Sequence, residues 1–280
     1  MIRSLLFVPA NAPRFVARAH ERGADAIILD LEDSVVPAAK YAARQALADA
    51  VPAVGRHGAT VLVRINAEPA LHIADAIAAC RAGAHGLMVP KTRSPDALRD
   101  LVASLEPHET GRAPMRFLPL LEDPGAVLDA RAIAAASPRI LGVSTGAEDL
   151  ATEMDAEPTP DVLRLPKLLV HLAAKAAGVL SFGMLRSVAD YRDGAGIAAS
   201  AWEARALGFD GATCIHPAVV PILNAAFAPD PAAIDHATRL IAAFEAASGD
   251  GRGAFSFEGR MVDLPVVERA RRLLRRAAAV

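Results

Sequence analysis

The stretch that decides the fold is residues 25–36, which read Asp25-Ala26-Ile27-Ile28-Leu29-Asp30-Leu31-Glu32-Asp33-Ser34-Val35-Val36. The apolar run at residues 26–29 is short and follows a Gly-Ala-Asp turn, which is typical of a strand buried on both faces. Such strands belong to parallel sheets that helices cover. Three carboxylates, Asp30, Glu32 and Asp33, follow within four residues. Burying them is costly unless they bind a cation or accept hydrogen bonds, so this strand end is also a candidate site.

The same strand-and-helix pattern recurs along the chain. We expect strands at residues 5–9, 26–30, 60–65, 86–90, 116–121, 139–143, 178–182 and 212–216. We expect helices at residues 14–22, 38–51, 70–82, from the N-cap Ser94 onward, and at 125–136, 160–177, 196–207 and 218–227, with a loop before residue 160. Eight such units predict a parallel sheet, and eight strands can close a (β/α)8 TIM barrel. A doubly wound sheet is the alternative, but no Gly-x-Gly-x-x-Gly follows the first strand.

The end of the chain departs from this repeat. We therefore expect residues 1–228 to form the barrel and residues 229–280 to form a C-terminal helix, a hinged lid and a terminal helix. A Gly-rich run at residues 248–253 precedes a short hydrophobic hairpin at 255–265, and a basic helix follows at 266–278. Glycine hinges beside such a hairpin are typical of a mobile lid or a swapped arm. A disordered tail is disfavoured because Phe255, Phe257, Met261 and Leu264 would favour burial.

Bulk composition narrows the class of protein. With 280 residues, 53% of them hydrophobic, the chain can bury a large core as one barrel. A formal net charge of −2 argues against nucleic acid or an anionic membrane as the main partner. Two cysteines, Cys80 and Cys214, have neither metal-site nor disulfide-framework spacing, which indicates a reducing compartment. We find no signal peptide and no apolar run long enough to span a membrane, so we expect a soluble, cytoplasmic protein.

Polar side chains follow nearly every predicted strand. In a parallel barrel the active site lies at the carboxyl ends of the strands, so these residues should converge at one rim. A barrel without a site would not need them there. The set comprises Asn11, Asp30, Glu32, Asp33, Arg64, Asn66, Lys91, Glu122, Asp123, Ser144, Thr145, Glu148, Asp149 and His216.

Glu122 and Asp149 are the candidate metal ligands within this set. They follow successive strands, and hard carboxylate oxygens with few other protein ligands suit Mg²⁺. No histidine cluster has zinc spacing. Asp123 precedes Pro124 and can cap a helix, which leaves Glu122 to face inward, whereas Glu148 is better explained as a cap. The acids Asp30, Glu32 and Asp33 then fit an outer shell around the metal.

Arg64 is the candidate for holding substrate oxygens. By strand alternation it shares the inward face with Leu62 and Asn66. An inward arginine can bind a carboxylate with two hydrogen bonds or stabilise a developing oxyanion. Pairing with Asp30 or Glu32 is the alternative, and it is compatible with that role.

Two other rim residues allow both a chemical and a structural role. Lys91 could form a Schiff base, but neutralising the neighbouring carboxylates is favoured because they keep its pKa high. His216 could act as an acid or base, but a structural hydrogen bond is the more frequent outcome for a lone histidine.

Basic residues near the first two strands offer phosphate contacts or ion pairs. Lys40 and Arg44 lie four residues apart on one helix face, where they could bind a phosphate or pair with Glu32 and Asp33. Arg3, Arg14 and Arg18 pose the same choice. We count Arg14, with Arg64, Glu122 and Lys91, among the candidate substrate-binding residues.

A set of motifs runs over nearly the whole chain in order. They are Arg3-Ser4-Leu5-Leu6-Phe7-Val8-Pro9, Asp30-Leu31-Glu32-Asp33-Ser34-Val35, Lys40 with Ala43-Arg44, Val63-Arg64-Ile65-Asn66, Val89-Pro90-Lys91, Gly146-Ala147-Glu148-Asp149-Leu150, Ile215-His216-Pro217 and Gly259-Arg260-Met261-Val262-Asp263-Leu264-Pro265. Together they resemble the citrate lyase beta-subunit-like enzymes of the HpcH/HpaI aldolase superfamily, which has malyl-CoA and citramalyl-CoA lyases as relatives.

The resemblance implies a (β/α)8 barrel in a homotrimer or hexamer, Mg²⁺ at Glu122 and Asp149, and substrate oxygens on Arg64. It also implies that Asp263 is a catalytic lid acid that enters the site of a neighbouring subunit. The expected activity is Mg²⁺-dependent cleavage of a 3-hydroxyacyl-CoA, such as malyl-, citramalyl- or citryl-CoA, to an acyl-CoA and an oxo acid. The alternatives are a thioesterase or condensing enzyme, a carrier-dependent citrate lyase beta subunit, and a Schiff-base aldolase using Lys91.

Overall fold

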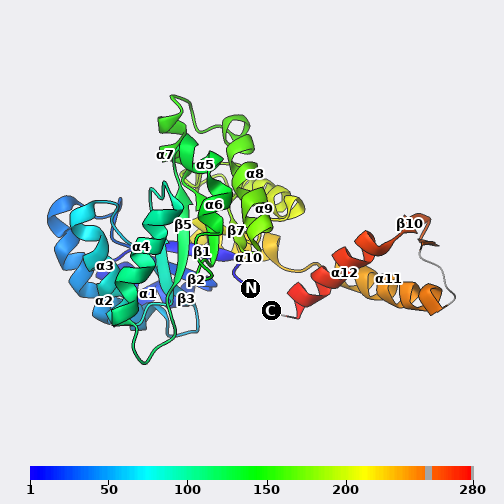
Figure 1. Cartoon of the computed structure of the whole chain (residues 1–280), viewed down its shortest axis with the longest axis horizontal. Helices are drawn as coiled ribbons and strands as arrows, with labels where there is room; N and C mark the ends of the chain where they lie inside the picture. The colour runs from blue at the N-terminus through cyan, green and yellow to red at the C-terminus, as the bar shows by residue number, and fades with distance from the viewer. Residues whose placement is uncertain (250–253, 279–280) are drawn as a thin grey trace. The chain divides into compact units, whose positions relative to one another are not determined.

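The computed structural model describes residues 1–249 and 254–278. The chain divides into two compact units, one comprising Ile2–Phe227 and the other Ala228–Val280 together with Met1. The first unit is built from strands and helices in alternation, with the strands inside and the helices around them (Figure 1).

Parallel strands form a ring in the first unit. They are β1 (Ser4–Pro9), β2 (Ala26–Asp30), β3 (Thr60–Arg64), β4 (Gly86–Val89), β5 (Arg116–Leu121), β6 (Gly142–Thr145), β7 (Leu180–Phe182) and β8 (Ala212–Cys214). The order is β7-β6-β5-β4-β3-β2-β1-β8. The ring closes between β7 and β8 through a Phe182–Gly211 bridge. There Gly183 N donates to Gly211 O at 2.9 Å, and Asp210 N donates to Ser181 O at 2.9 Å. The (β/α)8 barrel predicted from the sequence is confirmed.

Helices cover the outside of this ring. The α-helices are α1 (Pro13–Ala19), α2 (Lys40–Val54), α3 (Pro69–Ala82), α4 (Pro95–Leu105), α5 (Pro124–Leu128), α6 (Ala130–Ala134), α7 (Ala147–Glu153), α8 (Pro160–Ala177), α9 (Gly194–Leu207) and α10 (Val220–Phe227). Short 3₁₀ turns are η1 (His20–Arg22), η2 (Pro37–Ala39), η3 (Glu106–His108) and η4 (Pro217–Val219).

Three local predictions need correction. The loop expected before residue 160 contains α7, whose Ala-Glu-Asp-Leu-Ala-Thr-Glu sequence is rich in helix formers. The helix expected at residues 125–136 is divided into α5 and α6 at Asp129, whose φ of −90° and ψ of 7° leave the helical region. Strand β6 begins at Gly142, later than the expected residue 139.

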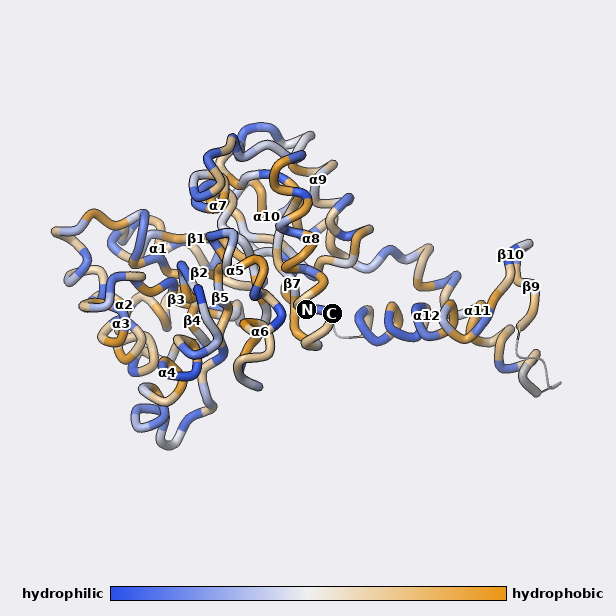
Figure 2. Tube along the Cα trace, turned by 45° about the horizontal axis from the view of Figure 1, so that its top comes forward, coloured by the Kyte–Doolittle hydropathy of each residue, from blue (hydrophilic) through white to orange (hydrophobic). Residues whose placement is uncertain are grey.

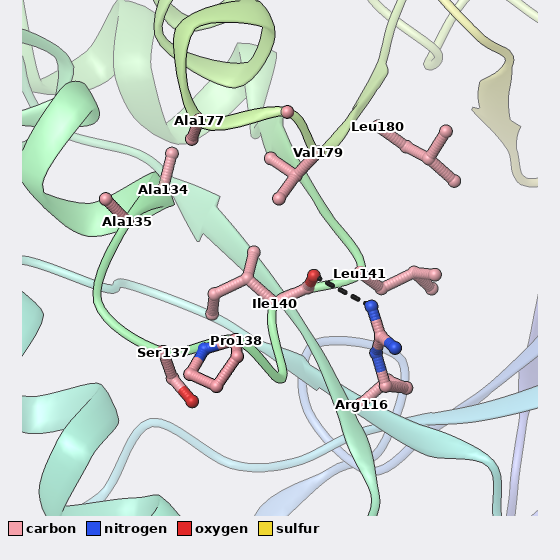
Figure 3. Close-up of a pocket in the computed structure, with 11 residues that line it drawn as sticks. Arg116, Ala134, Ala135, Ser137, Pro138, Ile140, Leu141, Ala177, Val179 and Leu180 are labelled. Carbon is pink, nitrogen blue, oxygen red and sulfur yellow. Dashed lines mark hydrogen bonds between the residues drawn. The ribbon is translucent and has the colours of Figure 1, made fainter.

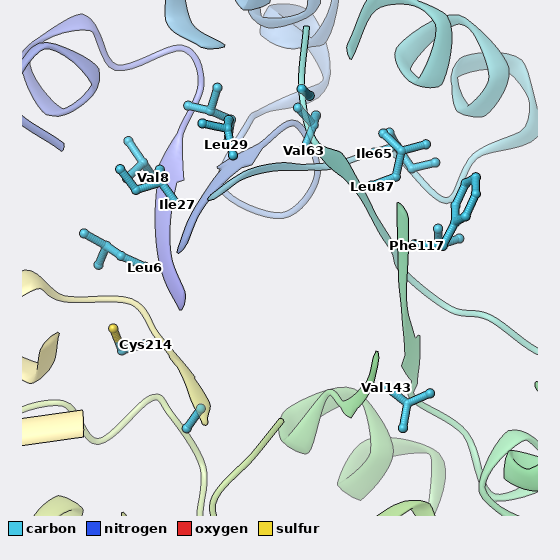
Figure 4. Close-up of a cluster of buried hydrophobic side chains, with 14 of the residues drawn as sticks. Leu6, Val8, Ile27, Leu29, Val63, Ile65, Leu87, Phe117, Val143 and Cys214 are labelled. Carbon is cyan, nitrogen blue, oxygen red and sulfur yellow. The ribbon is translucent and has the colours of Figure 1, made fainter. Parts of the chain in front are cut away.

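Alternation along the strands separates two apolar clusters. The inner face of the ring is filled by Leu5, Ala26, Ile28, Leu62, Met88, Leu118, Leu120 and Phe182. The outer face carries side chains such as Leu6, Ile27, Leu29, Val63 and Phe117, which point away from the ring toward the helices (Figure 4). Because Asp30 follows Ile28 by two residues and Arg64 follows Leu62 by two, both continue the inner face at the carboxyl ends of their strands.

The second unit contains two helices and a hairpin. Its elements are α11 (Pro231–Gly249), β9 (Phe255–Phe257), β10 (Arg260–Val262) and α12 (Leu264–Ala277). The expected hairpin is confirmed, with Arg260 paired to Phe257 and Val262 to Phe255. A small core built around Ala237, Leu240, Val262, Val267 and Ala270 holds it together. Helix α12 is rich in hydrophilic residues (Figure 2). Residues 250–253 of the predicted Gly-rich run lie outside the described residues.

Neither cysteine in the chain forms a disulfide, since Cys80 and Cys214 are both free and buried. Within residues 1–249 and 254–278, we find no helix with the length and apolar character needed to cross a bilayer.

Candidate active site

A cavity of about 530 Å³ opens at the carboxyl ends of the barrel strands. Residues from most of the strand exits line it, as the topology predicts. The lining includes Asp30, Asp33, Arg64, Leu120, Glu122, Ser144, Asp149, Lys167, Met184, Val188 and Ala189.

A second cavity, of about 520 Å³, lies at the amino ends of β5, β6 and β7. Most side chains that line it are apolar, and the Arg116 side chain donates to the Ile140 carbonyl oxygen at 3.2 Å (Figure 3). Catalytic chemistry is not expected at this end of a barrel, and Arg116 and Ser137 are the polar side chains in the lining. The cavity at the carboxyl ends is therefore the candidate active site.

Arg64 is held by carboxylates that follow β2. Its guanidinium binds Asp30 with two hydrogen bonds, of 2.6 and 2.7 Å. A third bond, of 2.8 Å, reaches Asp33, and Glu32 lies 3.3 Å away. Burial acts to lower the pKa of Arg64, but the hydrogen bonds and charge of Asp30 raise it above its usual value. Burial likewise opposes ionisation of Asp30, yet Arg64 keeps the pKa of Asp30 below its usual value. The predicted pairing of Arg64 with Asp30 is present, and it fixes the guanidinium at the cavity.

Glu122 occupies a pocket shaped by backbone. Its Oε2 accepts a 2.7 Å hydrogen bond from the backbone N–H of Lys91. Lys91 has a φ of 47°, a left-handed conformation that is uncommon outside glycine. On the other side, a Cβ at Gly146 would lie 2.2 Å from Glu122 Oε1. Glycine at position 146 is thus required for the carboxylate to sit where it does. The neighbouring Asp123 caps α5 by accepting from Ala126 N at 3.0 Å, as expected.

Carboxylates outnumber cations around the cavity. We define the carboxylate cluster as Asp30, Glu32, Asp33, Glu122 and Asp149, which Arg64 and Lys91 face. Burial raises the pKa of Glu32 to about 8, and the charges of Asp33, Glu122 and Asp30 add to this. Burial also raises the pKa of Glu122 to about 7, with Asp149 contributing. An acid with a pKa raised by its environment is a marker of functional sites. Two cations, Arg64 and Lys91, therefore face five carboxyl groups.

The donor set fits a magnesium ion. Lys91 Nζ lies 3.7 Å from Asp149 Oδ1. Burial acts to lower the pKa of Lys91, but the negative charge of Asp149 helps to raise it above its usual value. Among the described residues, no group of three or more His, Cys, Asp or Glu side chains is arranged to hold a metal. Glu122 and Asp149 together offer hard oxygens and leave the remaining positions for water and substrate, which is how Mg²⁺ is commonly bound.

Lys167 is a cavity residue that the sequence analysis missed. It extends from α8, is almost fully buried, and donates to the carbonyl oxygens of Met184 at 2.6 Å and Arg186 at 3.0 Å. Burial lowers its pKa to about 8. It therefore ties the segment after β7, which forms one wall of the cavity, to α8. The sequence signal was a lysine on the same helix face as the buried Leu163, Val170 and Ala174.

Asn66 and the basic residues of α2 lie away from the cavity. Strand β3 ends at Arg64, so alternation does not extend to Asn66, which was expected to face inward. Its amide instead donates to Asp75 on α3 at 2.6 Å and accepts from Lys40. Arg44 pairs with the same Asp75. The predicted pairing of Lys40 and Arg44 with Glu32 and Asp33 is wrong, because these cations serve a buried network between α2 and α3.

The remaining candidates also have defined places. Arg14 is exposed on α1, outside the cavity lining, with its guanidinium 4.5 Å from the Phe15 ring centroid. Arg3 forms two hydrogen bonds, each of 2.8 Å, to Asp25. His216 caps η4 through Nδ1, which accepts from Ala218 N at 3.2 Å, in line with the structural role favoured for it.

Asp263 belongs to the second unit. It is the N-cap of α12, where its Oδ1 accepts from Val266 N at 3.4 Å. It follows β10 directly and is half-buried. Exposed apolar residues, Met261 and Leu264, stand on either side of it in the sequence.

Comparison with known proteins gives a family match. Residues 3–217 match the family model of the HpcH/HpaI aldolases and citrate lyases. The chain belongs to the HpcH/HpaI aldolase/citrate lyase family. The resemblance seen in the sequence motifs is thereby confirmed.

Several members of this family are similar over almost their full length. Citrate lyase subunit beta of Escherichia coli (strain K12) is 34% identical over 287 residues, with 98% of this chain and 93% of that protein covered. A (3S)-malyl-CoA thioesterase of Cereibacter sphaeroides (strain KD131) is 35% identical over 282 residues, with 99% and 95% covered.

Solved structures of the family have the same fold. The CitE protein of Mycobacterium tuberculosis, in complex with magnesium, acetoacetate and coenzyme A, is 35% identical with a TM-score of 0.78, and 98% of this chain and 97% of that chain are covered. A citrate lyase from Burkholderia xenovorans LB400 has a TM-score of 0.86 at 22% identity, with 100% and 92% covered. The latter likeness concerns the fold alone.

The raised carboxylate pKa values predict how stability depends on pH in this family member. Glu32 and Glu122 have an ordinary pKa of 4.5, and folding raises these values to about 8 and about 7. The folded state then binds more protons than the unfolded state between these limits, so metal-free stability should fall as pH rises from about 5 to about 8. Mg²⁺ binds the deprotonated carboxylates, so its stabilising effect should grow over the same range.

Thermal unfolding in EDTA and in Mg²⁺ across pH 5–8 measures both effects. Lowering of the His171 pKa by burial acts in the opposite sense near its ordinary value of 6.5. A matched Glu32→Gln variant therefore serves as control, since the difference from wild type isolates one carboxyl. Equal pH slopes for the two proteins in EDTA would contradict the prediction.

Proposed function

We propose that this chain is a Mg²⁺-dependent carbon–carbon lyase that cleaves a 3-hydroxyacyl-CoA, of the malyl-, citramalyl- or citryl-CoA type, into an acyl-CoA and an oxo acid. The observation that carries the proposal is the meeting of Glu122, Asp149 and Arg64 at one cavity. Membership of the HpcH/HpaI family supports it, as does a relative whose structure holds magnesium, acetoacetate and coenzyme A.

We assign Glu122 and Asp149 as the metal ligands. Mg²⁺ there would bind the carboxylate and hydroxyl of the 2-hydroxy-acid end and withdraw negative charge from them. Asp30, Glu32 and Asp33 surround these ligands and fix Arg64. Lys91 offsets the charge of Asp149, and Lys91 and Arg14 are the further proposed substrate contacts.

The chain's own residues then supply proton transfer and charge stabilisation. A carboxylate base removes the hydroxyl proton of the substrate, and the oxygen forms the new carbonyl of the oxo acid. The bond between the carbinol carbon and the α-carbon breaks, and its electron pair moves to the α-carbon as the CoA enolate, which a proton then neutralises. Arg64 donates to the carboxylate and carbonyl oxygens of the developing oxo acid.

Asp263 is our proposed base. It follows a hairpin and stands between exposed apolar residues, which suits a carboxylate delivered by a lid. We propose that it acts in the site of a neighbouring copy within a homotrimer or hexamer. A cytoplasmic location is part of the same proposal, supported by the two free cysteines.

The test is a set of CoA esters assayed with and without metal. Malyl-, citramalyl- and citryl-CoA are incubated with the purified protein in Mg²⁺ or EDTA, and the oxo acid and acyl-CoA are quantified. We expect one ester to yield both products in a Mg²⁺-dependent manner. Full activity after complete metal removal would overturn the proposal.

Replacing Asp263 should remove the base without removing the fold. Asp263→Asn keeps an N-cap for α12, whereas Asp263→Ala also loses it, at about 0.5–2 kcal/mol. We expect both variants to lower kcat by about 10²–10⁴-fold, the range for general acid–base catalysis, with Mg²⁺ affinity unchanged. Steady-state kinetics and thermal unfolding separate the two effects. Asp235→Ala, an exposed acid on α11, is the control and should keep wild-type kcat.

A thioesterase on the same scaffold is the second candidate. It is favoured by the 35% identity to a (3S)-malyl-CoA thioesterase. Product analysis distinguishes the two reactions. Hydrolysis releases free CoA thiol and the intact hydroxy acid, whereas carbon–carbon cleavage yields an acyl-CoA and an oxo acid. A condensing enzyme would instead consume acyl-CoA and oxo acid together.

A carrier-dependent subunit is a third possibility, supported by the likeness to citrate lyase subunit beta. Such a protein would be inactive alone on CoA esters and would co-elute with an acyl carrier protein on gel filtration. The Schiff-base alternative at Lys91 predicts a borohydride-trapped adduct at that residue, but the 3.7 Å pair with Asp149 disfavours a neutral amine.

A further inference from the structure

The outer face of α8 carries an apolar stripe that the barrel does not cover. Leu165, Leu169 and Leu172 are 65%, 37% and 63% exposed. They are spaced four and then three residues apart, with the exposed Ala176 four further on, so they share one side of the helix. The stripe is about 16 Å long at 1.5 Å per residue. Scattered apolar residues are ordinary on a surface, but a continuous stripe marks an interaction site.

The neighbouring helix α9 carries a further exposed apolar side chain. Arg164 on α8 pairs with Glu203 on α9, which places the two helices side by side. Next to Glu203 lies Trp202, the one tryptophan in the chain, and it is 50% exposed. The guanidinium of Arg205 stands 5.4 Å from the Trp202 ring centroid. Tryptophan and arginine are the residue types enriched at the energetic centres of protein interfaces. We call Leu165, Leu169, Leu172 and Trp202 the α8–α9 patch.

We propose that the α8–α9 patch packs against the same patch of a second copy of this chain, with the two α8 helices antiparallel about a two-fold axis at Leu169. Of the two assemblies proposed above, such an axis fits a hexamer and not a homotrimer, and it requires a self-complementary surface. The stripe meets this requirement, because an antiparallel partner sets Leu165 of one copy against Leu172 of the other and Leu169 against itself.

Charge along α8 agrees with the antiparallel arrangement. Asp161 lies in the first turn of α8 and Lys175 in the last. Pairing about Leu169 brings the Asp161 end of each helix to the Lys175 end of its partner. Lys175 bonds Asp210 at 2.6 Å and is still partly exposed, so it can interact with a second carboxylate. A parallel arrangement would instead place the two acidic ends together.

The contact would reach the candidate active site through α8 itself. The face of α8 opposite the stripe carries Lys167, which holds the carbonyl oxygens of Met184 and Arg186. A second copy packed on the outer face of α8 would therefore restrict the motion of one wall of the cavity. The inference does not depend on which reaction that cavity performs.

The first test is the mass of the assembly in solution. Leu169→Glu places a charge on the proposed axis, and we expect it to halve the mass measured by multi-angle light scattering at a given concentration. The matched control is Leu128→Glu, another exposed leucine at the end of α5, which should leave the mass unchanged. Circular dichroism and thermal unfolding confirm that both variants fold. An unchanged mass for Leu169→Glu would overturn the proposal.

The second test fixes the geometry by disulfide formation in the full chain. Native Cys80 and Cys214 are buried, so an introduced surface cysteine reports alone. On mild oxidation, Leu169→Cys should form a cross-linked dimer with itself. Leu165→Cys should link to Leu172→Cys when the two variants are mixed, and far less to itself. If another element of the second copy covered the patch instead, Leu169→Cys would not link to itself, and that result would sink the two-fold arrangement.

Discussion

Arg64→Met is expected to destabilise the protein by about 3–5 kcal/mol at neutral pH and to abolish turnover in the fraction that stays folded. The size follows from what the guanidinium holds, since its removal leaves the ionised Asp30 buried without a cation. The loss of stability should shrink below about pH 5, where the carboxyls can protonate. Urea unfolding from pH 4.5 to 8, together with a lyase assay, measures both effects.

A second buried ion pair provides the control for Arg64. Arg139 pairs with the buried Glu109 at the other end of the barrel. Arg139→Met should lower stability in a similar way and leave kcat close to wild type. Arg64→Lys keeps the charge but not the two-bonded contact with Asp30, so it should recover part of the stability and little of the activity. Wild-type stability for Arg64→Met would contradict the role assigned to this cluster.

Glu122→Gln is expected to move stability and metal affinity in opposite directions. Glutamine preserves the shape that Gly146 accommodates, and its carbonyl can still accept from Lys91 N–H. It removes a buried carboxyl with a pKa raised to about 7, so the metal-free protein should become more stable at pH 8. Because a ligand charge is lost, Mg²⁺ affinity should fall by more than the roughly 10–100-fold typical of changes beyond the ligands.

Glu32→Gln tests whether Glu32 binds the metal directly or only lies next to the metal ligands. It also removes a buried carboxyl of raised pKa, so it should stabilise the metal-free protein in the same way. Its effect on Mg²⁺ binding should be smaller than that of Glu122→Gln. Titration calorimetry with Mg²⁺ and thermal unfolding in EDTA give the two quantities. A larger loss of affinity in Glu32→Gln would exchange the roles proposed for these two acids.

Most of the fold could be predicted from the sequence, because each strand shows the same local pattern of residues. Short apolar runs followed by polar residues placed all eight strands and predicted closure of the ring. Where the local pattern is weak, the observed boundaries differ from the predicted ones: β6 starts at Gly142, and α7 occupies part of the segment predicted as a loop. Helix α7 could have been recognised from its alanine and glutamate content.

The site was predictable where alternation held and obscure where it did not. Asp30 and Arg64 lie within strands, so period-two alternation brings them together correctly. Asn66 lies beyond the end of β3, where backbone direction changes and alternation no longer applies. Lys167 comes from a helix, so a list of strand exits could not include it. The need for glycine at position 146 follows from a close approach across the barrel that spacing along the chain does not reveal.

The extent of pairing between neighbouring strands differs around the ring. Neighbours such as β2 and β3 pair over five registers, whereas β7 and β8 meet at a single bridge. Local opening is easiest where pairing is sparsest, so hydrogen exchange at Gly183 and Asp210 should run ahead of exchange in β2. The segment that leaves β7 supplies Met184, Val188 and Ala189 to the cavity wall. Local opening between β7 and β8 would therefore change the cavity volume that an acyl chain can occupy, while the rest of the barrel stays closed.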